Sequence, residues 1–321
     1  NDAVQNGALV VNYTGHGGET GWTSERVLSI SDIISWENSS ALPLFLTATC
    51  EFSRFDDPLR TSGGALLLLN PRGGGSGLYT TTRLVYSRPN YFLNATFFER
   101  GFERLAGGEP KRMGDIFREV KNAHASSSNS RNFTFLGDPA LQFAIPKLNV
   151  VTTTVNGVPI STQDTLEALS KAVVEGYVAD EAGNKLGSYN GLVDVIVFDK
   201  VEEKRTLNND GNGVFSYEER ANRLFKGKAT VRNGDFEFSF VVPKDISYSF
   251  GKGKISYYSS NGEIDAHGYS EEFLIGGSNE NSLDDQEGPE IELFMNDRSF
   301  VYGGITDENP ILIAELADEQ G

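Results

Sequence analysis

The sequence predicts an α/β domain built on parallel strands, followed by an all-β sandwich domain. Short apolar strands alternate with helical segments over residues 1–147, which is typical of a parallel sheet with helices on its faces. From residue 148, segments rich in valine and threonine follow one another and are bounded by glycine or asparagine. The charge changes at the same point. Residues 1–149 carry 14 basic and 14 acidic side chains, so the whole net charge of -17 lies beyond them.

The elements of the first domain follow from hydrophobic periodicity and from helix start and stop signals. Apolar, β-branched runs predict the strands, and apolar residues at helical spacing predict the longer helices. Along the chain we predict a strand at 8–13, a short helix at 31–36 capped by Ser31, a strand at 44–49, a helix at 62–69 ended by Asn70-Pro71, a strand at 77–82, and helices at 89–105 and 113–123.

The elements of the second domain are strands alone. They are predicted at 150–155, 173–178, 193–198, 228–231, 236–242, 254–258 and 272–275. Asn233-Gly234 lies between two of them, which is a strong short-range signal for a hairpin over 229–240. We therefore assign an acidic β-sandwich to 148–276, a polar linker to 277–287, and the start of a further β module, expected to be truncated, to 288–321.

Composition narrows the classes of function. A hydrophobic fraction of 38% suits a globular protein, and no apolar run approaches the ~20 residues that span a bilayer. The chain begins at Asn1 without a methionine, so we expect a fragment, and the missing signal peptide carries no information. A single cysteine excludes an intrachain disulfide framework. The negative charge argues against nucleic acid as a partner.

Two candidate chemical groups follow two predicted strands. His16 lies in a glycine turn after the first strand, and Cys50 follows the second. If the strands are neighbours, both side chains emerge at one sheet edge, where an imidazole activates a thiol for attack on a carbonyl. The N–H groups of Gly17 and Cys50 then suit an oxyanion hole. The competing interpretation is a buried cysteine and a structural turn, and topology alone leaves the two interpretations about equal.

The motifs around these residues resemble the gingipain-type cysteine peptidases. They are Tyr-Thr-Gly-His-Gly-Gly at 13–18, Thr-Ala-Thr-Cys-Glu-Phe at 47–52, Thr-Thr-Thr-Arg at 80–83 and Leu-Gly-Asp-Pro-Ala-Leu at 136–141. The segments at 224–231 and 240–246 extend the resemblance to one branch, the PorU-type sortases of the type IX secretion system. The resemblance implies a caspase-like fold for the first domain, of which residues 1–147 are the C-terminal part.

The resemblance also implies roles for individual residues. His16 is expected to be the general base and acid, and Cys50 the nucleophile that forms a thioester with a cargo protein. Glu51 is expected either to bind substrate or to pair with Arg54, and Arg83 is expected either to contact a substrate carboxylate or to be a solvated surface residue. Trp22 is expected either to line the substrate pocket or to be a packing residue. The family's carboxylate that orients the histidine comes from an earlier part of the chain and is not found in this sequence.

The implied reaction is cleavage near the carboxyl end of a secreted cargo protein and its transfer to the amine of a surface glycolipid. The expected location is extracellular, at the outer-membrane surface of a Gram-negative bacterium, with an outer-membrane β-barrel as a further partner. No cofactor is expected. Two alternatives stay open: a gingipain-like endopeptidase that uses water, and a non-catalytic surface scaffold.

One loop resembles a calcium site. In Asn208-Asn209-Asp210-Gly211-Asn212-Gly213, the positions of Asp210 and Asn212 fit calcium ligands, and Glu219 fits the twelfth position. Position 1 is asparagine rather than aspartate, and strands are predicted on both sides. The spacing therefore favours a plain β-turn loop, and no metal site is assigned.

Overall fold

The computed structural model describes residues 1–209, 211–247, 249–278 and 290–317. The chain divides into two compact units, Asn1–Ile145 and Pro146–Gly321. Each is a separate body with its own hydrophobic core. Among the described residues, no helix is long and apolar enough to cross a membrane.

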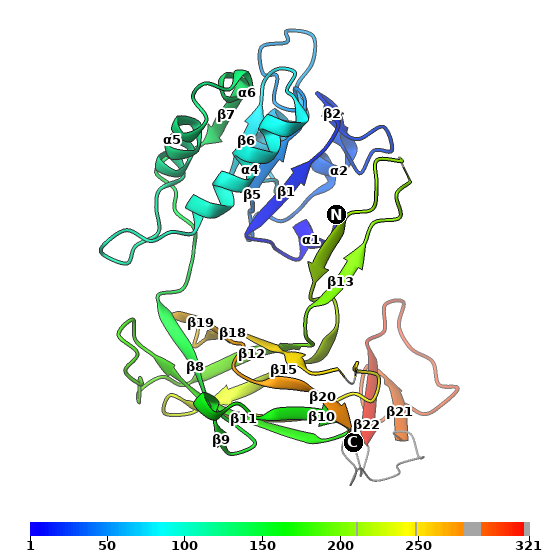
Figure 1. Cartoon of the computed structure of the whole chain (residues 1–321). Helices are drawn as coiled ribbons and strands as arrows, with labels where there is room; N and C mark the ends of the chain where they lie inside the picture. The colour runs from blue at the N-terminus through cyan, green and yellow to red at the C-terminus, as the bar shows by residue number, and fades with distance from the viewer. Residues whose placement is uncertain (210, 248, 279–289, 318–321) are drawn as a thin grey trace. The chain divides into compact units, whose positions relative to one another are not determined.

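The first unit is built around a four-stranded sheet in the order β1-β5-β6-β7 (Figure 1). Strands β1, β5 and β6 run parallel, whereas β7 is antiparallel to β6. The expectation of a parallel sheet is therefore wrong at one edge, where β7, a strand that was not predicted, follows α4, α5 and α6 and pairs antiparallel with β6. The strands are β1 (Val10–Thr14), β5 (Leu44–Ala48), β6 (Gly77–Thr81) and β7 (Phe133–Gly137), and a small separate sheet contains β2 (Gly17–Gly18), β3 (Gly21–Trp22) and β4 (Leu28–Ser29).

Helices cover both faces of this sheet. Leu44, Leu46 and Tyr79 pack in one cluster with side chains of α4 and α5, while Phe45 and Leu78 pack in another with α2 and α3. Successive side chains of β5 and β6 point to opposite faces of the sheet, and helices cover both faces. Every residue of these two strands is therefore buried. The helices are α1 (Asp2–Gln5), α2 (Ile30–Ser35), α3 (Gly63–Leu69), α4 (Ser87–Gly101), α5 (Met113–Ala123) and α6 (Ser128–Asn132).

Two predicted helix boundaries need correction. Ser29, not Ser31, is the N-cap of α2, because its side chain accepts from Asp32 N while the Asp32 carboxylate accepts from Ser29 N. Helix α4 begins at Ser87 and ends at Gly101, short of the predicted Leu105. Helix α5 has the predicted bounds, and α3 is capped by Ser62.

In the described part of the second unit, the regular structure is made of strands and one 3₁₀ turn at Ile160–Thr162. Its largest sheet has the order β15-β12-β18-β19-β8-β11-β16, with β9 paired to β8. A three-stranded sheet, β10-β20-β17, contributes to the same core. Not all pairs are antiparallel, since β8 with β19 and β10 with β20 are parallel. The strands are β8 (Leu148–Val155), β9 (Val158–Pro159), β10 (Thr165–Ala168), β11 (Lys171–Ala179), β12 (Gly191–Phe198), β15 (Arg223–Val231), β16 (Asp235–Val241), β17 (Gly251–Lys252), β18 (Lys254–Ser260), β19 (Asp265–Ser270) and β20 (Leu274–Ser278).

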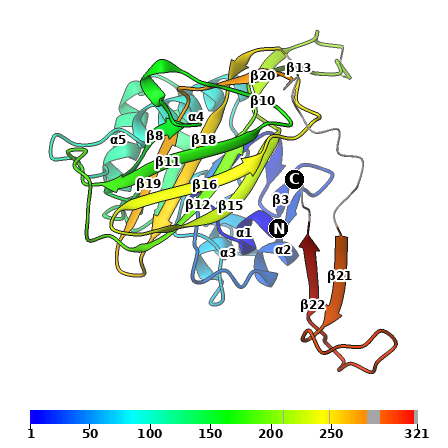
Figure 2. The same ribbon diagram turned by 90° about the horizontal axis from the view of Figure 1, so that it is seen from below.

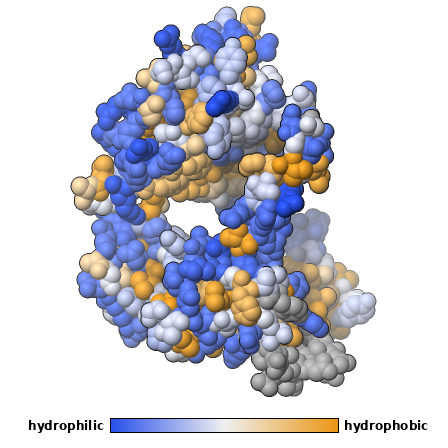
Figure 3. All heavy atoms as spheres, in the orientation of Figure 1, coloured by the Kyte–Doolittle hydropathy of each residue, from blue (hydrophilic) through white to orange (hydrophobic). Residues whose placement is uncertain are grey.

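Two further hairpins complete this unit. Strands β13 (Glu202–Arg205) and β14 (Ser216–Glu219) flank the loop that resembles a calcium site, and β21 (Glu290–Met295) pairs with β22 (Leu312–Ala317). Asp210 and the predicted linker residues 279–287 lie outside the described residues. Among the residues that the structure describes, no group of three His, Cys, Asp or Glu is placed to hold a metal. On the face in Figure 3, hydrophilic side chains cover much of this unit.

The predicted hairpin over 229–240 has the expected turn but not the expected ladder. Asn233 and Gly234 have positive φ angles of 51° and 83°, as the Asn-Gly signal requires. Beyond the single bridge between Arg232 and Asp235, however, β15 pairs with β12 and β16 with β11. The two strands still run side by side (Figure 2). The sheet is therefore curled so that its two edges meet at this turn.

Two matched Asn-Gly turns in this unit allow a test of how the turn contributes to stability. Gly157 and Gly234 both have positive φ, but a Cβ at Gly157 would have no heavy atom within 4 Å, whereas one at Gly234 would lie 2.5 Å from the Leu186 carbonyl oxygen. We expect Gly157→Ala to lower the free energy of unfolding by about 1 kcal/mol, and Gly234→Ala to lower it by roughly 2–4 kcal/mol. Urea unfolding of both variants measures the difference, and equal losses would contradict the clash.

Candidate active site

The site is built at the carboxyl ends of neighbouring parallel strands. In the register of β1 and β5, Thr14 lies opposite Ala48, and the Gly15 N–H continues the pairing by donating to the Ala48 carbonyl at 3.4 Å. His16 and Cys50 each follow the last paired residue of their strand by two positions. Parallel strands end at the same edge of the sheet, so both residues leave the sheet there. His16 is exposed and Cys50 is half-buried.

Backbone hydrogen bonds fix the turn that carries His16. The His16 carbonyl accepts from the Tyr13 hydroxyl at 2.6 Å and from the Thr23 N–H at 2.9 Å. The Tyr13 ring stacks on Trp22, with centroids 4.4 Å apart and planes 3° apart. The backbone of the histidine turn is therefore fixed by Tyr13, whose ring stacks on Trp22, and by Thr23, which follows β3.

The Gly17 N–H is directed to an open sheet edge. Opposite residues in an antiparallel pair alternate between hydrogen-bonded and non-hydrogen-bonded positions. Gly17 lies opposite Trp22, and the bond from Thr23 N to His16 O flanks this pair, so Gly17 and Trp22 occupy a non-hydrogen-bonded position. Because β2 is the edge strand of β2-β3-β4, the Gly17 N–H points away from β3. This direction suits the predicted oxyanion donor.

The turn after Cys50 is tight and anchored to β6. Glu51 has a φ of 50°, a left-handed conformation that is uncommon outside glycine, and its N–H donates to the Arg83 carbonyl at 3.4 Å. Ser53 N donates to Thr81 O at 2.9 Å. The Cys50 thiol donates to the Val85 carbonyl at 3.6 Å. The cysteine therefore lies on a sharp strand-to-loop turn that the residues after β6 hold in place.

Buried hydroxyl groups lie beneath this turn. Thr47 Oγ1 donates to Thr80 Oγ1 at 2.8 Å, and Ser53 Oγ lies 2.8 Å from the same oxygen. Thr81 Oγ1 donates to the Thr49 carbonyl. All of these side chains are fully buried. Satisfied buried polar networks are rigid, so this one fixes the end of β5 against β6.

Ion pairs join the loops around the site. Arg54 contacts Glu19 at 3.2 Å and Glu51 at 3.3 Å, and Arg60 contacts Glu19 at 3.7 Å. Glu19 belongs to the loop between β2 and β3, so these pairs connect the histidine turn to the loop after Cys50. No role for Glu19 was expected from the sequence. Its only signal was a carboxylate three residues after the histidine, which does not predict a partner 35 residues away.

The residues predicted to bind substrate have partners within the chain. The side chain of Glu51 accepts from Arg54, and the guanidinium of Arg83 forms two hydrogen bonds with Asp56, at 3.0 and 2.5 Å. Trp22 is only 6% exposed and packs against Phe45 and Phe52. The packing alternative therefore describes the environment of Trp22 in this structure. The substrate contacts of all three residues stay predictions.

The pair of Arg83 and Asp56 predicts a pH effect. The hydrogen bonds from Arg83 hold the pKa of the Asp56 carboxyl below its ordinary range. A depressed folded pKa stabilises the protein above the unfolded pKa, and this contribution is lost as pH falls through the folded value. Titration followed by NMR should show that Arg83→Gln raises the pKa of Asp56 toward the ordinary value of about 4. An unchanged pKa in that variant would contradict the assigned cause.

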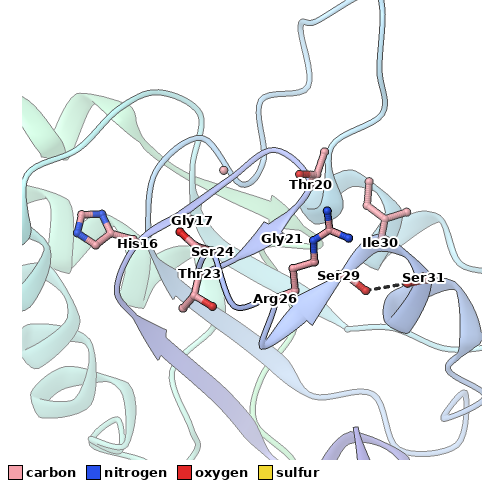
Figure 4. A pocket seen from close by; sticks show the side chains of 11 residues that line it. His16, Gly17, Thr20, Gly21, Thr23, Ser24, Arg26, Ser29, Ile30 and Ser31 are labelled. Atoms are coloured by element: carbon pink, nitrogen blue, oxygen red, sulfur yellow. Dashed lines mark hydrogen bonds between the residues drawn. The ribbon is translucent and has the colours of Figure 1, made fainter.

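A cavity of about 590 Å³ opens beside the histidine turn, between β2 and the start of α2. His16, Gly17 and Gly18 line one part of it, and Arg26, Ser29 and Ser31 line another. In Figure 4 the His16 ring lies at one side of the labelled group and points away from it, Ile30 and Ser31 lie at the far side, and the Arg26 side chain lies between them. The cavity therefore adjoins the turn that carries the candidate base and has room for a bound group.

Comparison with known families agrees with this geometry. Residues 1–144 match the model of peptidase family C25. They form a domain of that family. Membership of this family supports the interpretation of the domain as a cysteine peptidase.

The solved structures similar to this chain include relatives from one bacterium. Dimeric latent PorU from Porphyromonas gingivalis is 31% identical, with a TM-score of 0.48 over 68% of this chain and 22% of PorU. The complex of the pro- and mature domains of RgpB from the same organism is 16% identical, with a TM-score of 0.40 over 83% of this chain and 56% of that one. The chain thus spans about a fifth of the length of PorU. No curated protein sequence matches it.

Proposed function

We propose that this C25 domain is part of a cysteine transpeptidase, a sortase that cleaves secreted cargo proteins and transfers them to an amine. The observation that carries the proposal is the parallel register of β1 and β5, which brings the only cysteine and a histidine to one sheet edge. The partners are the cargo, a glycolipid acceptor and an outer-membrane β-barrel, and the location is the cell surface of a Gram-negative bacterium. The identity with PorU supports the sortase branch.

We also infer the finer features of the fold. The mixed sheet with helices on both faces supports a caspase-like arrangement for the first unit. The shared core of the seven-strand ladder and the three-stranded sheet supports a β-sandwich for the second unit. In this arrangement the β-sandwich carries the acidic charge, and the α/β domain carries the chemistry.

The first half of the reaction forms a thioester. The Cys50 thiolate attacks the carbonyl carbon of the scissile peptide bond, and the carbonyl electrons move to oxygen. The Gly17 N–H, which points to the open edge, and the Cys50 N–H stabilise that oxyanion. His16, as imidazolium, gives its proton to the leaving nitrogen as the carbon–nitrogen bond breaks. The amino-terminal part of the cargo stays on Cys50 as a thioester.

The second half returns the enzyme to its starting state. The acceptor amine attacks the thioester carbon, His16 removes the proton from the amine, and the carbon–sulfur bond breaks to release the thiolate. The product is a new amide. If water replaces the amine, the same steps give a carboxylic acid, which is the reaction of an endopeptidase.

The proposal is tested by measuring how much of the thioester is transferred to an amine and how much is hydrolysed by water. Full-length protein is incubated with a cargo peptide and increasing concentrations of a simple amine such as glycinamide, and mass spectrometry measures the amide and acid products. A sortase gives amide in proportion to amine concentration, whereas acid alone identifies an endopeptidase and overturns the transfer step. Absence of both cleavage and a Cys50 adduct would leave the non-catalytic scaffold as the conclusion.

A further inference from the structure

The cavity beside His16 has a chemical character of its own. Its walls carry the hydroxyl groups of Thr20, Ser24, Ser29 and Ser31, and Arg26 is the lining residue with a permanent charge. The hydroxyl of Ser29 donates to Asp32 and bonds with that of Ser31, whereas the hydroxyl groups of Thr20 and Ser24 and the Arg26 guanidinium are donors that a bound group can use. A guanidinium also matches the geometry of a carboxylate or phosphate. The lining therefore suits a negatively charged oxygen group.

Among the described residues, Arg26 also has no acidic partner. Across the described parts of the chain, no carboxylate forms an ion pair with its guanidinium. By contrast, the neighbouring Arg54, Arg60 and Arg83 are each paired with aspartate or glutamate. A guanidinium with no internal counter-ion at the wall of a cavity remains available to an external one.

The loop that carries Arg26 is strained and tied to the histidine turn. Thr23 and Arg26 both have a φ of 57°, which is uncommon for non-glycine residues and unfavourable for a β-branched one. Thr23 N donates to His16 O at 2.9 Å, and Thr23 Oγ1 accepts from Val27 N at 3.4 Å. Such strain persists only where surrounding bonds enforce it. These bonds place Arg26 at a defined position relative to His16.

We propose that this cavity is a subsite for an oxyanion group carried by a substrate, and that Arg26 determines its specificity. The inference rests on the proposed function, because the group belongs to one of the two substrates of that reaction: the cargo on the carboxyl side of the cleaved bond, or the amine acceptor. In this arrangement the reacting atoms lie beside the part of the cavity lined by His16 and Gly17, and the oxyanion lies next to Arg26.

Two pairs of probes separate the two sources. The acceptor pair is 4-aminobutanoate and its neutral amide, 4-aminobutanamide, in competition for the same thioester. The cargo pair consists of two peptides that differ only by Glu or Gln on the carboxyl side of the cleaved bond. We expect the full-length wild type to prefer the anionic member of one pair by about tenfold, the equivalent of about 1.4 kcal/mol.

Substitutions then assign that preference to Arg26. In Arg26→Gln the preference should fall below about twofold, and in Arg26→Glu it should reverse. Arg26→Lys should retain part of it, because lysine keeps the charge without the planar pair of donors. Arg72→Gln is the matched control, since Arg72 pairs with Glu37 and does not line the cavity. Because the readout is a ratio within each variant, partial loss of folded protein does not change it.

The outcomes separate this inference from the proposed function. No preference in either pair, or a preference that survives Arg26→Gln, overturns the subsite while cleavage and transfer still stand. If the protein forms no thioester, titration calorimetry of Cys50→Ala with the same four probes decides the question without chemistry. Tighter binding of an anionic member that depends on Arg26 supports the subsite, and equal binding overturns it.

Discussion

Replacing Cys50 with alanine is expected to abolish cleavage and transfer of cargo. The substitution removes the only thiol of the chain, so no thioester can form. His16→Ala should have an effect of similar size, because nucleophile and base act as one unit and their effects do not add. We expect each variant to lower kcat/KM by about three orders of magnitude or more. Cargo processing by full-length protein, followed on gels and by mass spectrometry, measures this effect.

The control for this prediction is a measurement showing that the Cys50→Ala variant is still folded. Cys50 is half-buried, and its thiol makes one weak hydrogen bond to Val85, so Cys50→Ala should change thermal stability little. Arg72→Gln, an exposed change elsewhere in the domain, should process cargo like the wild type. Normal processing by a folded Cys50→Ala variant would remove the enzyme interpretation and favour the scaffold.

Much of the first unit could be predicted because local signals and burial agree there. The apolar runs that became β5 and β6 are fully buried, and α5 has the bounds that its periodicity indicated. The predicted cap of α2 was wrong because serines at 29 and 31 both lie just before the apolar pair Ile33-Ile34, and only the reciprocal bonds between Ser29 and Asp32 distinguish them. Charged strands such as β13 and β14 gave no signal, because their side chains are largely exposed.

The candidate site could be predicted only as far as two strand ends. His16 and Cys50 could be placed at strand ends because each comes just after an apolar run and carries a side chain that can act in catalysis. The ion pairs of Glu19 with Arg54 and of Asp56 with Arg83 could not be predicted, because the paired residues are 35 and 27 positions apart in the sequence. Surface charges of both signs are common, and without the fold nothing selects one pairing over another. Likewise, the cavity at Arg26 depends on a strained loop that composition does not reveal.

A second large effect is expected from Gly17→Ala. A Cβ at Gly17 would lie 2.5 Å from Thr49 Oγ1 and 3.0 Å from the Gly21 carbonyl oxygen. Thr49 is fully buried at the end of β5, and its carbonyl is held by Thr81, so it has little freedom to move. The strain should therefore displace the glycine turn instead. That displacement moves the Gly17 N–H and the adjacent His16 together.

The expected loss is larger in catalysis than in stability. Overpacking of this kind costs about 1–3 kcal/mol of unfolding free energy. Displacing the base and an oxyanion donor by a fraction of an ångström to 1 Å lowers kcat/KM by about 100-fold. Gly18→Ala is the matched control, because a Cβ there has no heavy atom within 4 Å. Its unfolding free energy should stay within about 1 kcal/mol of the wild type, since open space at Gly18 requires no displacement.

A second substitution tests the cause. Among the described residues, Thr49 Oγ1 is a buried oxygen without a hydrogen-bond partner, so Thr49→Ala alone should cost little. In the double variant Gly17→Ala with Thr49→Ala, the main clash is gone, and the remaining contact with Gly21 O is tight but longer. Activity should then recover to within about tenfold of the wild type, because the glycine turn can return toward its original position. Equal activity of the double variant and Gly17→Ala would show that the loss arises from the backbone of the turn itself rather than from its contact with β5.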